Sequence, residues 1–120
     1  MDDGTATMAQ LKTLMADFIA ARHWQKYHRP KNLAMSIAIE AGELMELFQW
    51  TGPDESDDTL ADPKARAKLA HEMADVLSFL LSLSNVTGID LAASFEAKMQ
   101  DNDRKYPAEK VRGRYERPGS

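Results

Sequence analysis

Residues 33–50 read LAMSIAIEAGELMELFQW, and this stretch decides the fold. It contains no proline, and its apolar residues lie on most sides of a helical projection, which predicts a helix that is largely buried. Glu40 and Glu43 interrupt it three residues apart, so they share one face of that helix. A carboxylate removed from water without a partner is costly. The stretch therefore indicates a structural or chemical reason for keeping two acids among apolar residues.

Residues 69–86, LAHEMADVLSFLLSLSNV, repeat the arrangement with Glu72 and Asp75. If the two helices pack side by side, four carboxylates come together, and a bound cation would neutralise them. The chain has no Cys and no spaced His pair among these acids, which favours Mg²⁺, with Mn²⁺ as a substitute, over zinc. We therefore predict a metal site formed by Glu40, Glu43, Glu72 and Asp75. The alternative is that these acids are ordinary solvated side chains.

Composition excludes several classes of protein. With 120 residues, of which 43% are hydrophobic, the chain is expected to be one folded domain. The net charge of −4 leaves no basic face for a nucleic-acid polymer, and no run approaches the roughly 18 apolar residues of a membrane span. The first residues, MDDGTATM, lack the basic start and apolar core of a signal peptide. We expect a cytoplasmic protein without membrane partners.

Start and stop signals divide the chain into four helices. A capping box at Thr7 begins the first, which is expected to end near Trp24, and Asn32 is expected to cap the second. The acidic stretch 51–62 lacks the alternation of an EF-hand and is expected to be a solvated loop. Asp62-Pro63 begins the third helix, which is expected to stop near Gly88, and Asp90 begins the fourth. The prediction is an all-α four-helix bundle over residues 1–107, with a polar basic tail over 108–120. The surplus apolar surface of the second and third helices predicts an oligomer.

Four aromatic residues are expected near the acids. An aromatic slot beside a metal site is what stacking on a nucleobase requires, although an aromatic residue taken singly is more often core than ligand. Di-iron bundles use a Glu-x-x-His motif, and no His follows any of the four acids by three residues, which counts against redox iron. An all-oxygen site open to water suits phosphate ligands, where Mg²⁺ orients an attacking water. The candidate slot residues are Trp24, His28, Trp50 and Phe79.

Five motifs in order carry a resemblance to a known family. They are WQKYHRPKNL at 24–33, EAGEL at 40–44, ELFQW at 46–50, EMADVL at 72–77 and KMQDNDRKYP at 98–107. Together they resemble the all-α nucleoside triphosphate pyrophosphohydrolases of the MazG type, with the closest likeness to the dCTP pyrophosphatase branch. The resemblance covers about residues 15–107.

The resemblance implies a helical bundle assembled as a homodimer or homotetramer, with active sites between subunits. It implies hydrolysis of a nucleoside triphosphate between the α and β phosphates, giving the monophosphate and pyrophosphate. The four acids fall on Mg²⁺ ligands, and Glu43 is our candidate for the base that takes a proton from water. The candidate aromatic slot, together with Lys98 and Asn102, falls on nucleotide-binding positions. Phe79 replaces a tyrosine and Met15 a histidine of the branch, so the base preference is open.

We therefore read the chain as a Mg²⁺-dependent pyrophosphohydrolase that removes excess or non-standard deoxynucleotides, dCTP or a 5-substituted dCTP. Two alternatives stay open at this point. One is the same chemistry on dUTP or another non-standard nucleotide. The other is a non-catalytic helical regulator or a toxin–antitoxin-like interaction module, which would have no reason to keep all four acids.

Overall fold

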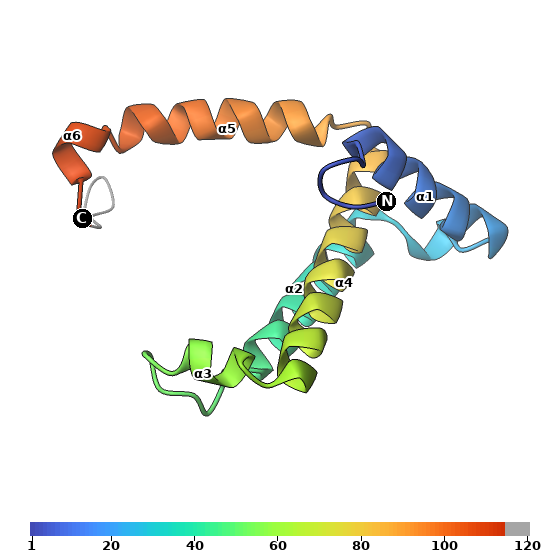
Figure 1. The fold of residues 1–120 in the computed structure, drawn as a ribbon. Coiled ribbons are helices and arrows are strands. Elements are labelled where there is room, and N and C mark those ends of the chain that lie inside the picture. The colour runs from blue at the N-terminus through green and yellow to red at the C-terminus, as the bar shows by residue number, and fades with distance from the viewer. Residues whose placement is uncertain (115–120) are drawn as a thin grey trace. The chain divides into compact units, whose positions relative to one another are not determined.

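The computed structural model describes residues 1–114, and every regular element in that range is helical, as predicted (Figure 1). No single helix in this range is long and apolar enough to cross a membrane; the helices Pro63–Thr87 and Leu91–Lys105 meet that test only when joined across the break between them. Residues 115–120 of the predicted tail lie outside the described residues. The elements are α1 Met8–Ala21, the 3₁₀ turn η1 Gln25–Tyr27, α2 Pro30–Glu46, α3 Ser56–Leu60, α4 Pro63–Thr87, α5 Leu91–Lys105 and α6 Ala108–Val111.

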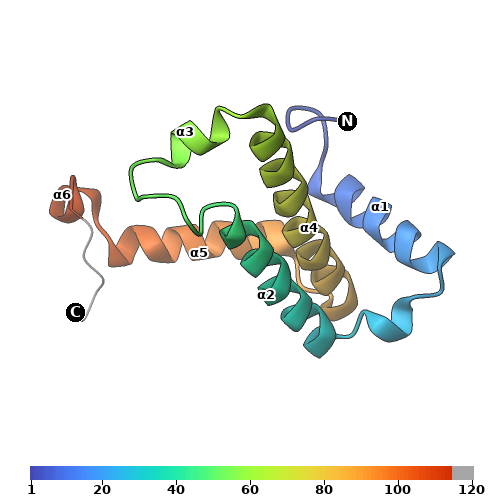
Figure 2. The same cartoon turned by 90° about the horizontal axis from the view of Figure 1, so that it is seen from below.

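Two compact units divide the chain, and the first ends at Gly88. The predicted single domain over 1–107 therefore contains this boundary. Within the first unit α2 packs along α4, α1 packs on α4, and the short α3 contacts α4 as well. Figure 2 shows α4 between α1 and α2. Because α2 and α4 lie side by side, the two acidic faces found in the sequence are able to meet.

The start of α1 confirms the predicted capping box. Thr7 Oγ1 accepts a hydrogen bond from the backbone N–H of Gln10 at 3.1 Å, and Gln10 Oε1 accepts one from the N–H of Thr7 at 2.8 Å. The expected end near Trp24 is wrong, because α1 ends at Ala21. His23 has a φ of 53°, a left-handed conformation that a continuing helix does not allow. This break turns Trp24 away from the α1 axis and into the connection that precedes α2.

The start of α2 differs from the prediction. Arg29 is the N-cap residue and Pro30 occupies the first turn, where its missing N–H costs nothing. Asn32 is therefore not the cap; its Nδ2 donates to the Tyr27 carbonyl at 3.3 Å. The regular helix ends at Glu46, and residues 47–50 form turns instead of a last helical turn.

Two short helices were not expected from the sequence. α3 forms inside the acidic stretch. Asp57 and Asp58 lie in its first turn, where their negative charges interact favourably with the positive N-terminal end of the helix dipole. α6 forms at the start of the predicted tail. The two long C-terminal helices begin as predicted, since Asp62 accepts from the N–H of Lys64 at 3.0 Å and Asp90 from the N–H of Ala93 at 2.9 Å. α4 also stops as predicted, at Gly88 with a φ of 72°.

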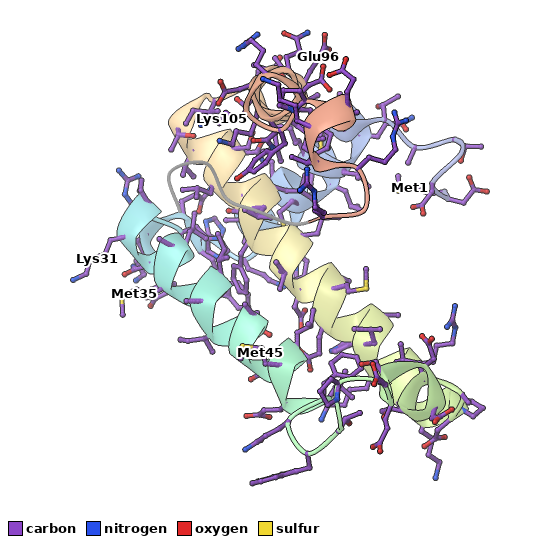
Figure 3. All side chains as sticks on the ribbon, turned by 90° about the vertical axis from the view of Figure 1, so that its left-hand side faces the viewer. Met1, Lys31, Met35, Met45, Glu96 and Lys105 are labelled. Carbon is purple, nitrogen blue, oxygen red and sulfur yellow. The ribbon has the colours of Figure 1, made fainter. Side chains whose placement is uncertain are left out.

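The core of the first unit is small. Among residues 1–114 the buried hydrophobic side chains are Ile19, Leu33 and Leu81. The expectation that α2 is largely buried is wrong for the single chain, because α4 covers one side of it and leaves the other open. Met35, Ile39 and Met45 are exposed, Met45 by 70%. Figure 3 shows Met35 directed away from α4.

Candidate functional site

An acid cluster forms where α2 and α4 lie side by side. Glu40 and Glu43 come from α2 and Glu72 from α4, and each offers a carboxylate oxygen such that the three oxygens lie within 4.8 Å of one another. Glu72 is buried, Glu40 is half-buried and Glu43 is exposed. The structure therefore brings together three of the four acids that the spacing predicts. We call these three residues the acid cluster.

Two oxygens of the acid cluster are enclosed and unpaired. Glu40 Oε2 and Glu72 Oε2 are buried and have no hydrogen-bond partner in the described part of the chain. A buried carboxylate oxygen without a donor is unfavourable, and such atoms are rare in folded proteins. A hard cation would satisfy both, and a set of donors made only of carboxylate oxygens fits Mg²⁺ or Mn²⁺. The residues present therefore fit the metal that the sequence predicts.

Asp75 lies one turn beyond Glu72 on α4 and stands apart from the three-oxygen group. Its negative charge nevertheless acts on Glu40. Its Oδ2 is 3.7 Å from Nε2 of His71, which the sequence analysis did not include in the site. The spacing of four residues on one helix was the available signal for that pair. Asp75 therefore lies near enough to join the site.

The acid cluster changes the protonation of Glu40. The pKa of Glu40 is raised from an ordinary 4.5 to about 6. Loss of hydration is the largest cause, followed by the charge of Glu43 and a hydrogen bond with Glu43. The charges of Asp75 and Glu72 raise the pKa further. A bound cation would reverse the sign of this local field. The metal-free cluster therefore holds a proton at mildly acid pH.

This protonation predicts how the stability of the metal-free protein depends on pH. Because the folded-state pKa of Glu40 is raised above the unfolded value, the folded protein holds a proton that the unfolded chain releases between pH 4.5 and about 6. Stability therefore falls as the pH rises through this window. Glu40→Gln, which cannot ionise, is expected to be more stable than the parent at pH 7.5 by on the order of 1 kcal/mol, and equal to it below pH 4.5.

Thermal melts in EDTA from pH 4 to pH 8 measure this difference. Glu46→Gln is the matched control, because Glu46 is an exposed glutamate on the same helix outside the acid cluster. The same Tm difference between Glu40→Gln and the parent at every pH would contradict the raised pKa.

A cavity of about 420 Å³ adjoins Asp75. Trp24, His28 and Phe79 line it, so the structure brings together three of the four predicted slot residues. The His28 and Phe79 rings stack with centroids 6.2 Å apart and planes at 29°. Met15, at which the chain departs from the resemblance, lies in the same wall. The full lining is Met15, Phe18, Ile19, Trp24, His28, Asp75, Ser78 and Phe79. We call this space the aromatic cavity.

Three residues of this wall were not predicted as site residues: Phe18, Ile19 and Ser78. The Phe18 ring meets Trp24 edge-to-face with centroids 5.9 Å apart, and the Arg22 guanidinium lies 3.8 Å from the Phe18 ring centroid. Ser78 follows Asp75 by three residues, and this spacing on one helix face was the signal that could have found it. The cavity is thus aromatic on the α1 side and partly polar on α4.

Trp50 is not brought to the aromatic cavity within one chain. It is 89% exposed and lies beyond the far end of α2 from His28. The 17 residues of α2 extend over about 25 Å, which separates the two positions. Within one chain Trp50 is therefore separated from the aromatic cavity.

Lys98 and Asn102 lie on α5 in the second unit. The Asp101 carboxylate forms ion pairs with three basic side chains there: Lys98 Nζ at 3.8 Å, Arg104 Nη2 at 3.5 Å and Lys105 Nζ at 3.1 Å. Lys105 makes the largest contribution to the lowered pKa of Asp101. Asn102 Nδ2 is 3.9 Å from Met99 Sδ. The structure thus shows the immediate partners of these two residues, and their assignment to a nucleotide remains a proposal.

Comparison with known families decides the identity of the fold. The model of the MazG-like family matches residues 35–117, which include both acidic motifs. The chain belongs to the MazG-like family. The resemblance seen in the sequence is thereby confirmed, and the acid cluster lies on helices inside the matched region.

Curated proteins and a solved structure extend the likeness of this MazG-like chain. It is 39% identical over 106 residues to dCTP pyrophosphatase 1 of Homo sapiens, covering 88% of this chain and 62% of that protein. It is 37% identical over 107 residues to dCTP pyrophosphatase 1 of Bos taurus, covering 89% and 63%. The chain thus spans somewhat less than two thirds of these relatives. A crystal structure of a pyrophosphatase from Archaeoglobus fulgidus superposes with a TM-score of 0.79 at 41% identity, covering 89% of this chain and 98% of that one.

Proposed function

We propose that this chain hydrolyses a deoxynucleoside triphosphate between the α and β phosphates, giving the monophosphate and pyrophosphate, with Mg²⁺ as cofactor. The observation that carries the proposal is the acid cluster, in which two enclosed oxygens lack partners, beside a cavity lined by aromatic rings. Relatives named dCTP pyrophosphatase 1 support the same chemistry on dCTP. The substrate proposed for this chain is dCTP or a 5-substituted dCTP. The activity serves to remove excess or non-standard nucleotides.

The residues of the acid cluster have different proposed roles, which follow from their exposure. Glu40 and Glu72 carry the enclosed oxygens and would hold the metal with Glu43, supported by Asp75. When bound, Mg²⁺ neutralises phosphate charge and makes a water more acidic. Glu43 is the exposed member, so one of its oxygens could take a proton from an attacking water.

The aromatic cavity supplies the place for the base. Trp24 and Phe79 offer flat faces for stacking, and Asp75 lies in the same wall, so a base held there would direct its phosphates toward the acids. Stacking alone discriminates poorly among bases, and for this reason dUTP or another non-standard nucleotide remains the alternative substrate. Lys98 and Asn102 of α5 are proposed to contact the phosphates or sugar.

A panel of nucleoside triphosphates with Mg²⁺ tests the proposal. Each reaction is scored for pyrophosphate and for inorganic phosphate, since release of pyrophosphate alone reports cleavage between the α and β phosphates. We expect dCTP and 5-methyl-dCTP to be cleaved faster than purine nucleotides, with dUTP slower than dCTP. Loss of activity in EDTA and its return with Mg²⁺ is the control. A panel without turnover would favour the non-catalytic interaction module.

We propose further that the active form is a homodimer or homotetramer. Met35, Ile39 and Met45 on α2 and Met73 on α4 are exposed, and a second copy is the partner that would cover them. The same assembly is the means by which the exposed Trp50 would reach a cavity, that of another subunit. The compartment is proposed to be the cytoplasm, where the nucleotide pool lies.

Multi-angle light scattering at micromolar concentration is expected to give a mass of at least twice 13.4 kDa. Met35→Glu combined with Ile39→Glu places charges on the exposed face and should lower the mass to that of one chain, together with activity. Glu46→Lys, a charge change on the same helix at an already polar position, is the control. An active monomer of 13.4 kDa would overturn the shared-site assembly.

A further inference from the structure

The His28 ring stands between two cavities. It lines the aromatic cavity on one side, and it also lines a second cavity of about 420 Å³. Ile19 is the other residue that lines both. His28 is 9% exposed, so little of its ring is free except where these cavities reach it. His28 therefore lies within reach of a ligand in the aromatic cavity.

Ser82 holds this ring from the side of the second cavity. Its Oγ lies 2.9 Å from His28 Nδ1, and the serine is 3% exposed. Ser82 lines the second cavity and is absent from the lining of the aromatic cavity. Within residues 1–114 the hydroxyl makes no other hydrogen bond, not even to the carbonyl one turn earlier that helical serines often use. Both neutral tautomers of the ring fit the 2.9 Å distance. Donation from Ser82 Oγ to Nδ1 gives the buried hydroxyl proton an acceptor, which favours the tautomer with an unprotonated Nδ1.

The second ring nitrogen then carries the proton. Burial lowers the pKa of His28, and its partner is a hydroxyl and not an acid, so the imidazole is neutral. In a neutral ring with Nδ1 accepting, Nε2 bears the hydrogen. Nε2 makes no hydrogen bond in the described part of the chain, and it is not among the enclosed unpaired atoms, which belong to Glu40 and Glu72. Nε2–H is thus an unused donor whose nitrogen is not fully enclosed by the described residues.

We infer that Ser82 is a positioning residue that fixes His28 as an Nε2–H donor, and that this donor selects cytosine over uracil at ring atom N3. The inference rests on the proposed function. N3 of cytosine is an acceptor, whereas N3 of uracil carries a hydrogen, so a fixed donor bonds the first and opposes the second. The exocyclic amino group of cytosine is itself a donor, so it cannot accept the hydrogen of His28 Nε2. A site built to bond a polar atom rejects an analogue that lacks it more strongly than an apolar wall does.

Nitrogen NMR of the whole protein labelled with ¹⁵N-histidine tests the tautomer without any nucleotide. His28 is assigned as the signal set that is missing in His28→Gln. The expected pattern is an unprotonated Nδ1 and a protonated Nε2. The reverse pattern, or a ring carrying both protons at pH 7.5, would overturn the inference even if every variant failed to fold.

Kinetics test the selection. Ser82→Ala is expected to narrow the kcat/KM preference for dCTP over dUTP by roughly three- to tenfold, mainly by raising KM for dCTP, as loss of one neutral hydrogen bond implies. 3-deaza-dCTP has C–H in place of N3. The parent should turn it over with a kcat/KM lower than that for dCTP by a similar factor, whereas Ser82→Ala should show little difference between the two nucleotides. Ser82→Thr keeps the hydroxyl and should keep the preference. Ser84→Ala removes another buried serine of α4, one that lines neither cavity, and should leave the dCTP preference unchanged.

The outcomes separate the two proposals. An unchanged dCTP preference in a folded Ser82→Ala protein overturns the inference while the proposed function stands. Equal turnover of dCTP and 3-deaza-dCTP by the parent overturns reading at N3. A parent that cleaves no nucleotide overturns the proposed function and the base selection with it, whereas the NMR pattern still reports how Ser82 holds the ring.

Discussion

Glu72→Gln is expected to lower kcat/KM by roughly a hundredfold or more while leaving the helices folded. Loss of a group that merely supports a metal ligand costs about 10–100-fold, so loss of a ligand should cost at least as much. Glutamine keeps the shape of the side chain and removes one charge from a crowded group of acids. The metal-free variant should therefore melt no lower than the parent, because repulsion within the acid cluster is relieved.

Turnover of dCTP at several Mg²⁺ concentrations, together with melts in EDTA and in Mg²⁺, measures both effects. The parent should gain Tm on adding Mg²⁺, and Glu72→Gln should gain little. Glu46→Gln is the matched control, since it removes an exposed glutamate of α2 outside the acid cluster. Parental turnover in Glu72→Gln would mean that the acid cluster is not the metal site.

Leu33→Ala is expected to lower the free energy of unfolding by about 2–5 kcal/mol. Leu33 is 1% exposed and is the largest fully buried side chain in the described part of the chain. It lies at the start of α2, on the element that carries Glu40 and Glu43 along α4. With so few buried hydrophobic residues, there is little other core to compensate for the cavity left behind.

Urea unfolding followed by circular dichroism at fixed protein concentration gives the free energy. Leu33→Met keeps the volume and should cost less than about 1.5 kcal/mol. Leu14→Ala removes an apolar residue of α1 that is 61% exposed and lies outside the face assigned to a second copy, so it should leave stability nearly unchanged. A loss in Leu33→Ala no larger than that of Leu14→Ala would contradict the core assigned here.

Local signals in the sequence were sufficient for most helix ends. The capping box at Thr7, the Asp62-Pro63 start and the stop at Gly88 depend on neighbours within four residues, and all three are confirmed. The expected end of the first helix failed at His23, because a left-handed conformation outside glycine has no reliable local signal. Asn32 failed as a cap because Pro30 starts α2 earlier.

The candidate site was predicted in part, because helix spacing is also a local signal. Residues three or four apart on one helix share a face, so Glu40 with Glu43 and Glu72 with Asp75 could be paired from the sequence. Their meeting across α2 and α4 was an expectation that depended on packing, and it holds for three of the four acids. Trp50 shows the limit of this reasoning, since its place in a motif could not show that α2 would separate it from His28.

The sequence by itself determined the helical class, the acidic pairs and membership of the MazG-like family, because helix periodicity, caps and motif order are properties of short segments. Only the tertiary structure decided that Phe18 and Ser78 share a wall with Trp24, and that Ser82 bonds His28 across 54 positions of the chain. Such contacts depend on the relative rotation and register of packed helices. A single turn of a helix moves a side chain by about 5.4 Å, enough to make or break a hydrogen bond.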